Sequence, residues 1–167
     1  MRYRPNDADA YHAKGLSLDE LGKYQEAIEN YDIAIQYDST NLDIYINRGV
    51  ALNELGHNQE AIKNYDIAIK YKPDFAVAYH AKGNALKNLE KLLEAIENYD
   101  QAILYRPNYA DHYNSKGIAL NELGRHQEAM ESYNLAIKYD SDNVYAYQLA
   151  NELAKKIKKS NLRIITD

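Results

Sequence analysis

Carboxamide side chains are the most distinctive candidates for molecular recognition in this sequence. Each amide offers two N–H donors and a carbonyl acceptor, so several in a row can hold a peptide backbone without reading its side chains. They stand in segments of helical periodicity: Asn47, Asn53, Asn84, Asn88, Asn114 and Asn121. The alternative is compositional, because a chain rich in Asn, Ile, Lys and Tyr is typical of an A+T-rich genome. The sequence leaves both explanations open.

Histidines are the other side chains that could do chemistry, as metal ligands or proton carriers. The chain has His12, His57, His80, His112 and His126. His12 and His80 occupy equivalent places two helix pairs apart, about 20 Å or more at the usual helix spacing. That distance prevents them from sharing a metal, whose bonds to nitrogen are about 2 Å long.

Motifs of catalysis are absent from the sequence. There is no cysteine, no HExxH motif and no glycine-rich phosphate loop. The many carboxylates stand on solvated helix faces, where nothing would bury an acid–base pair. We therefore expect no enzymatic activity, no metal and no cofactor.

Composition places the chain among globular proteins. It has 167 residues, of which 46% are hydrophobic and 27% charged, and this length allows a sizeable core. The net charge of −5 opposes a nucleic-acid surface. No apolar run approaches the roughly 20 residues that span a bilayer, and the first residues lack the apolar core of a signal peptide. We therefore expect a cytoplasmic protein without a membrane partner, although a secreted effector would share this composition.

Self-comparison reveals a repeat of 34 residues without insertions. The units that start at residues 8 and 76 share the stretches YHAKG and EAIENYD, and all 7 glycines fall in two columns. A period of this length indicates a stacked array of units. The predicted divisions are the remnant of a preceding helix B at 1–7, full units at 8–41, 42–75, 76–109 and 110–143, a capping helix at 144–159 and a frayed tail at 160–167.

Each unit is predicted to fold into two helices, A and B. Polar residues before helix A are expected to cap its first turn: Asn6, Thr40, Asp74, Asn108 and Asp142. Helix A should end at the column of Gly22, because glycine suits a left-handed residue. Glu90 replaces that glycine in the third unit, so either this residue is strained or the turn differs. Helix B stops before Pro73 and Pro107 in two units.

Small and aromatic columns predict how the helices pack. Gly15 and its equivalents lie inside helix A, where glycine costs about 1 kcal/mol relative to alanine, so a second helix should cross closely there. Alanine columns of helix B, such as that of Ala27, predict the other side of this contact. Three tyrosine columns are expected to fill the spaces between helices, with their hydroxyls at the edge. They begin with Tyr11, Tyr31 and Tyr37.

The pattern resembles the tetratricopeptide repeat family. The resemblance rests on the period, on Tyr11 with Gly15 four residues later, and on the alanines and tyrosine of helix B. The family's usual Trp is Tyr here, and its usual Leu before the glycine is a cation expected to lay its stem over apolar surface: Lys14, Arg48, Lys82 and Lys116. The resemblance implies an all-α, right-handed superhelical solenoid, whose A helices line a concave groove for segments of partner proteins.

The groove is expected to be lined by helix A residues outside the packing columns. These are His12, Leu16, Asp19, Asn47, Val50, Asn53, Glu54, His80, Asn84, Lys87, Asn88, Asn114, Asn121 and Glu122. The same count also gives Asp9, Glu20, Asp43, Ile46, Val77, Asp111, Ile118, Tyr145, Gln148, Glu152, Lys155 and Lys156. Acidic residues outnumber basic ones and concentrate in the first two units, so we expect a basic or neutral partner segment. The alternative is that Asp9, Asp43 and Asp111 mainly complement helix dipoles.

Chaperone-binding members of the resembled family hold a C-terminal carboxylate with a clamp of Lys, Asn and Arg. The corresponding places here carry His12, Leu16, Asn47, Val77 and Ala81, of which Asn47 alone matches. The resemblance therefore implies a partner other than a chaperone tail.

Two other functions stay open. The stretch 2–6 matches 104–108, the end of a helix B, so the chain is either a segment of a longer array or one with a short leader. In the first case its open ends would associate with other repeats or with other copies. RNA binding, as in related helical-repeat families, is opposed by the acidic groove and by the lack of a basic stripe.

Overall fold

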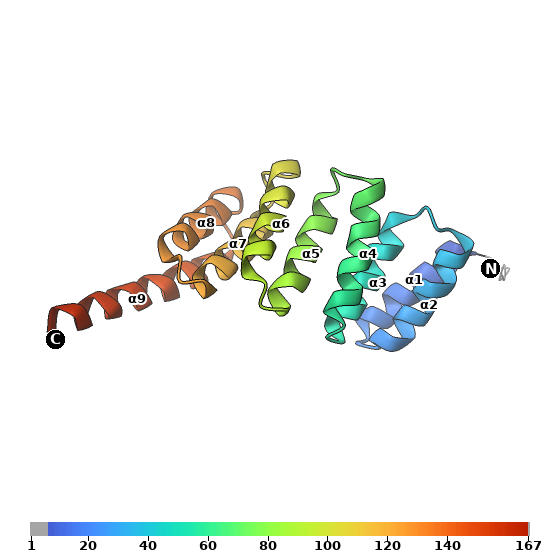
Figure 1. Cartoon of the computed structure of the whole chain (residues 1–167), viewed down its shortest axis with the longest axis horizontal. Helices are drawn as coiled ribbons and strands as arrows, with labels where there is room; N and C mark the ends of the chain where they lie inside the picture. The colour runs from blue at the N-terminus through green and yellow to red at the C-terminus, as the bar shows by residue number, and fades with distance from the viewer. Residues whose placement is uncertain (1–6, 167) are drawn as a thin grey trace.

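The computed structural model describes residues 7–166 and shows, over that range, helices joined by short turns and no strand. The helices form antiparallel pairs that stand in one row (Figure 1). They are α1 (Ala8–Glu20), α2 (Tyr24–Tyr37), α3 (Leu42–Glu54), α4 (Asn58–Tyr71), α5 (Ala76–Asn88), α6 (Leu92–Tyr105), α7 (Ala110–Glu122), α8 (His126–Tyr139) and α9 (Val144–Thr166). The predicted all-α solenoid is confirmed.

Contacts between successive helices hold the row together. Each helix packs against the next one along the chain. In addition, α1 contacts α3, α3 contacts α5 and α5 contacts α7. The odd-numbered helices, which are the predicted A helices, therefore form one layer of the solenoid and the even-numbered helices form the other.

Close approach of the two layers depends on glycine, alanine and one tyrosine column. A Cβ atom added at Gly49 would stand 2.5 Å from Tyr65 Cε1, so only glycine leaves room for this ring. Tyrosines of this column are buried in every pair: Tyr31, Tyr65, Tyr99 and Tyr133. The alanines beside them have no exposed surface: Ala27, Ala34, Ala61, Ala68, Ala95, Ala102, Ala129 and Ala136. The close crossing predicted from the glycine column is confirmed.

The third tyrosine column does not fill the core, contrary to the prediction. Tyr37, Tyr71, Tyr105 and Tyr139 are the last residues of their helices, and Tyr71 is 68% exposed. The rings of Tyr37, Tyr105 and Tyr139 instead stack at the edge of the array on tyrosines of the first column. The Tyr79 and Tyr105 ring centroids, for example, are 5.7 Å apart. The prediction was wrong because the last residue of helix B lies beyond the layer that would cover it.

The predicted helix caps lie one residue too early. Asp7 and Asn41 are the residues that cap α1 and α3 through their side chains, whereas Phe75 and Tyr109 at the starts of α5 and α7 make no such bond. Thr40 instead donates its backbone N–H and its hydroxyl to Asp38 Oδ1, at 2.8 and 2.6 Å. That turn takes up the extra residue before the helix begins. Predicted Asp74, Asn108 and Asp142 also lie one residue too early, because the helices begin at Ala76, Ala110 and Val144, and Asn6 lies outside the described residues.

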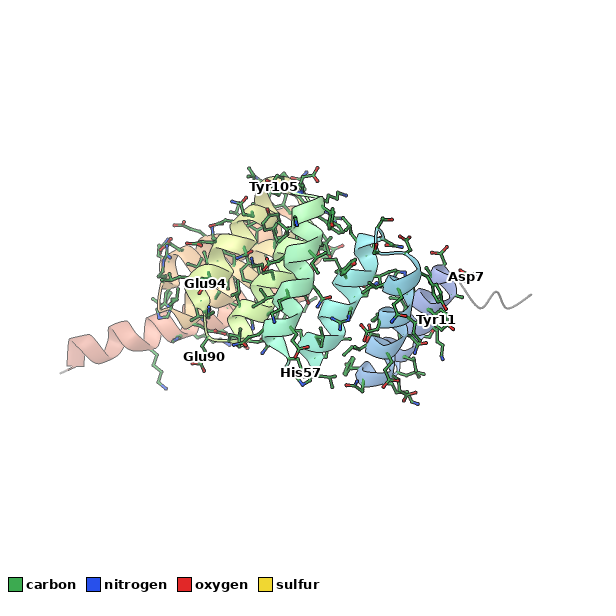
Figure 2. All side chains as sticks on the ribbon, turned by 45° about the vertical axis from the view of Figure 1, so that its right-hand side comes forward. Asp7, Tyr11, His57, Glu90, Glu94 and Tyr105 are labelled. Carbon is green, nitrogen blue, oxygen red and sulfur yellow. The ribbon has the colours of Figure 1, made fainter. Side chains whose placement is uncertain are left out.

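Turns between the paired helices use left-handed residues. Gly22, Gly56 and Gly124 have φ of 72°, 79° and 79°. Glu90 has φ of 60°, so the third pair makes the same turn with a residue that carries a Cβ atom. Of the two alternatives, strain at Glu90 is therefore the correct one. Glu90 lies at the edge of the array opposite Tyr105 (Figure 2).

The cations before the glycine column do more than cover apolar surface. Arg48 pairs with Asp32 at 2.7 Å, and Lys82 pairs with Asp66 at 2.6 Å. Lys116 makes the equivalent ion pair with Asp100. Each pair joins an odd-numbered helix to the even-numbered helix before it, so it links successive units.

The last helix is longer than predicted. α9 runs from Val144 to Thr166, past the helix boundary predicted at 159. No Gly or Pro occurs in this stretch to end the helix. Leu153, which is 2% exposed, fixes the helix to the core, and the C-terminal part extends past the other helices (Figure 1).

Candidate functional site

The odd-numbered helices together line a pocket of about 420 Å³. Predicted groove residues form much of its wall: Asn53 from α3, His80, Asn84, Lys87 and Asn88 from α5, and Asn114 from α7. Asp111, Ser115 and Ile118 of α7 and Tyr145 of α9 complete it. The pocket therefore spans four successive helices of one layer, and four of its ten lining residues are asparagines.

Hydrogen bonds within the wall fix the orientation of the amides. The Tyr99 hydroxyl donates to Asn84 Oδ1 at 2.8 Å, which turns the Asn84 NH₂ group away from the tyrosine. Asn88 Nδ2 donates to Asn53 Oδ1 at 3.2 Å, across the junction between α5 and α3. The Asn53 NH₂ group and the Asn88 carbonyl are thus left for other partners.

Two histidines lie beneath this wall. His112 is 2% exposed, and its Nδ1 lies 3.0 Å from Nδ1 of His80, so one ring donates and the other accepts. Burial, then the neighbouring His80 and Arg106, lowers the pKa of His112 to about 4. Burial also lowers the pKa of His80, although Asp111 acts in the opposite direction. The pair is therefore neutral at physiological pH.

Unpaired polar atoms distinguish the floor of the pocket. Asn114 is only 4% exposed, and neither Oδ1 nor Nδ2 has a hydrogen-bond partner within the described part of the chain. His112 Nε2 is buried and unpartnered in the same way. A buried amide without a partner costs about 1–3 kcal/mol, and such groups need a reason to persist.

The other predicted groove residues lie outside this pocket. Asn47 Nδ2 is 2.8 Å from His12 Nε2, so these two side chains hold each other across α1 and α3. Leu16 and Val50 are each 40% exposed, Asn121 is half-buried, and Glu54 and Glu122 are exposed.

Asp19 has a structural partner that the sequence did not reveal. The Tyr31 hydroxyl donates to Asp19 Oδ2 at 2.6 Å. Burial raises the pKa of the Asp19 carboxyl and nearby Glu54 adds to this effect, while the Tyr31 bond lowers it. Asp19 therefore accepts the hydrogen bond of the buried Tyr31 hydroxyl.

Sequence reasoning missed Ser115 and His112. Ser115 was not counted as a groove residue, although it lines the pocket. His112 occupies the place of Ile44, Ala78 and Ala146, which have no exposed surface. The signal was available, because a histidine in a column of apolar residues breaks the repeat.

Neither a metal site nor a membrane span can be identified in residues 7–166. No group of three or more His, Asp or Glu residues in that range is close enough to hold a metal ion. None of the helices there is both long and apolar enough to cross a membrane.

The chain belongs to the tetratricopeptide repeat family. Residues 15–56 and 49–90 match the family described as TPR repeat, and residues 80–144 match the one described as Tetratricopeptide repeat. There is no match among curated protein sequences.

Solved structures share the fold along most of the chain. TTC0263, a thermophilic TPR protein of Thermus thermophilus, is 18% identical with a TM-score of 0.80, over 90% of this chain and 83% of that one. The MamA protein is 25% identical with a TM-score of 0.74, over 91% and 88%. The first TPR of Spaghetti (RPAP3), solved with the HSP90 peptide SRMEEVD, is 26% identical with a TM-score of 0.68, over 74% and 98%.

Proposed function

We propose that the protein is a protein-interaction scaffold that binds an extended segment of a partner protein along its odd-numbered helices. The observation that carries this proposal is the pocket shared by α3, α5, α7 and α9, with amide donors and acceptors on its wall. An extended peptide presents donors and acceptors at regular intervals, so a row of oriented amides suits it. The RPAP3 repeat that carries a bound HSP90 peptide supports the same use of the fold.

The bound segment is proposed to be neutral or basic. Asp19 and Glu54 lie close enough for Glu54 to raise the pKa of Asp19, so negative charge gathers at the N-terminal half of the layer. A basic segment would relieve this repulsion and associate faster at low salt. The places of a carboxylate clamp carry His12, Leu16 and Val77, which do not suit a chaperone tail.

Affinity capture with the intact chain tests the proposal. The groove variant Lys87→Ala/Asn88→Ala removes two side chains of the pocket wall. Its matched control, Lys63→Ala/Asn98→Ala, removes the same residue types from α4 and α6 in the other layer. At least one recovered protein should be lost with the groove variant and kept with the control. Its purified segment should then bind the intact chain directly. If every recovered protein is insensitive to the groove variant, the proposal is wrong.

Self-association is a second candidate, favoured by a face of α1 that no other helix of residues 7–166 covers. Ala10 and Ser17 are exposed there, whereas the equivalent Ile44 and Ala51 of α3 have no exposed surface because α2 covers them. Lys14 has no ion-pair partner within residues 7–166, although its equivalents all pair with an aspartate. Light scattering over a range of concentrations tests this candidate. A mass that rises with concentration, and that Ser17→Glu holds at one chain, would support it, whereas a constant mass would exclude it.

A further inference from the structure

Two buried polar residues lie at the pocket and beneath it. Asn114 belongs to a groove column that is mostly polar, with His12, Ile46, His80 and Gln148 at the equivalent places. What distinguishes Asn114 is that both of its polar atoms are buried without a partner in the described part of the chain. His112, beneath the pocket, breaks an apolar column, because the equivalent Ile44, Ala78 and Ala146 have no exposed surface. Breaks of local consistency of this kind concentrate at functional sites.

The amide of Asn114 defines what a ligand must offer. Its NH₂ group needs an acceptor and its carbonyl needs a donor, and the described part of the chain provides neither. Both atoms are buried in this structure, so pairing with a ligand requires a change in the conformation of the Asn114 side chain. Only a group with a donor and an acceptor on one edge would pair with both.

A primary carboxamide is the common side-chain group that meets this requirement. Its N–H and C=O lie side by side, so it can form two parallel hydrogen bonds with the Asn114 amide. A trans peptide group has its N–H and C=O on opposite sides and offers one at a time. A carboxylate has acceptors only, so it would leave the Asn114 carbonyl without a donor. It would also lie near the negative charge of Asp111, although Lys87 lines the same pocket. An apolar side chain would leave Asn114 unpaired.

We propose that the Asn114 pocket is a subsite for the carboxamide of an Asn or Gln side chain in the bound segment. This inference rests on the proposed function, because it assigns one side chain of the partner segment. His80 lines the same pocket, and its Nδ1 lies 3.0 Å from Nδ1 of His112. Backbone contacts of Asn53, Asn84 and Asn88 would place the segment, and Asn114 would select the residue.

Random-peptide display against the intact chain tests both levels of this inference. We expect selected peptides to carry Asn or Gln at one fixed position. With Asn114→Leu as the target, this preference should disappear while peptides are still selected. Peptides that need Lys87 and Asn88 but show no Asn or Gln preference would overturn the inference and leave the proposed function standing. A failure to select any peptide that depends on Lys87 and Asn88 would overturn both.

A direct titration makes the test independent of peptide selection. The probe is N-acetylglutamine methylamide, added to ¹⁵N-labelled intact chain, and the Asn114 side-chain signal is identified by its absence in Asn114→Leu. We expect this signal to shift with the glutamine probe, and the glutamate counterpart to bind about tenfold more weakly because one hydrogen bond is lost. The norleucine counterpart should leave the signal in place. Equal shifts with all three probes, or no shift with glutamine, would overturn the inference. Circular dichroism of Asn114→Leu checks that the variant is folded.

Discussion

Gly83 lies directly against the ring of Tyr99, so that a Cβ atom at residue 83 would stand 2.6 Å from Tyr99 Cε1. Tyr99 is fully buried and its hydroxyl is bonded to Asn84, so the ring has little freedom to move. Gly83→Ala should therefore lower the free energy of unfolding. Overpacking costs about 1–3 kcal/mol, and the better helix propensity of alanine offsets about 1 kcal/mol of this. Urea unfolding of both proteins measures the difference.

A double-mutant cycle isolates the contact between residues 83 and 99. Val in place of Tyr99 removes all three ring atoms that the new methyl group would meet, Cε1, Cδ1 and Cζ, because valine has no δ carbon. In the Tyr99→Val background, Gly83→Ala should be neutral or stabilising, because the propensity gain of about 1 kcal/mol then acts alone. If Gly83→Ala costs the same in both backgrounds, the ring is not the cause.

Glu90→Gly should stabilise the protein. Glu90 has φ of 60°, a conformation that costs a residue with a Cβ atom about 1–2 kcal/mol. Glycine removes this strain and loses part of the gain through the entropy of the unfolded chain, so we expect a rise of about 0.5–1 kcal/mol in the free energy of unfolding. Urea unfolding checks it.

The matched control for this prediction is Glu97→Gly, at an exposed position inside α6. Glycine there costs about 1 kcal/mol through helix propensity alone. The two glutamate-to-glycine changes should therefore have opposite signs. A loss of stability with both would show that Glu90 is not strained.

The array could be predicted from the sequence because the 34-residue period places the same residue types at equivalent positions of each unit. Gly22 and Pro73 mark where helices end, and Gly15 marks where they cross. Helix starts were predicted one residue early. Before α3 the turn that Asp38 makes with Thr40 competes with capping, and this signal is not periodic, because Lys72 and Arg106 occupy the place of Asp38 in the next two units. The Tyr37 side chain is exposed because it stands at the end of α2, and the hydropathy of the sequence does not indicate this position.

The candidate site was predicted less completely than the fold. Helical periodicity indicated the face that carries Asn84 and Asn88, because one face follows from spacing alone. The bond between Asn88 and Asn53 and the contact between His80 and His112 join different units, at distances set by superhelix geometry. Periodicity within one unit does not contain these distances. His112 was nevertheless recognisable as a polar residue in an apolar column.

Acid should destabilise the protein through the histidine pair. The pKa of His112 is about 4 in the folded protein, below about 6.5 in an unfolded chain. The unfolded state therefore binds more protons between these values, and stability falls as the pH drops from about 6.5 to about 4, by up to about 3 kcal/mol. His80, whose pKa is also lowered, acts in the same direction. Urea unfolding at several pH values measures the fall.

His112→Ala tests whether this residue causes the pH dependence. Alanine occupies the same column at Ala78 and Ala146 without exposed surface, so the variant should fold. Its stability should fall less than that of the wild type between about pH 6.5 and about pH 4. A variant that retains the full decrease would exclude His112 as its source.

Asn114→Leu should stabilise the protein at neutral pH, because the wild-type amide is buried without a partner. Removing such a group recovers about 1 kcal/mol or more, and Ile46 shows that an aliphatic side chain fits the equivalent place. Asn64→Leu is the matched control. Asn64 is equally buried, but it donates to the Glu60 carbonyl at 2.8 Å and accepts from Arg48 at 3.2 Å. Its loss should lower the free energy of unfolding by about 1 kcal/mol or more. Equal effects of the two changes would mean that Asn114 is satisfied in solution, which would remove the energetic basis for assigning it to a ligand.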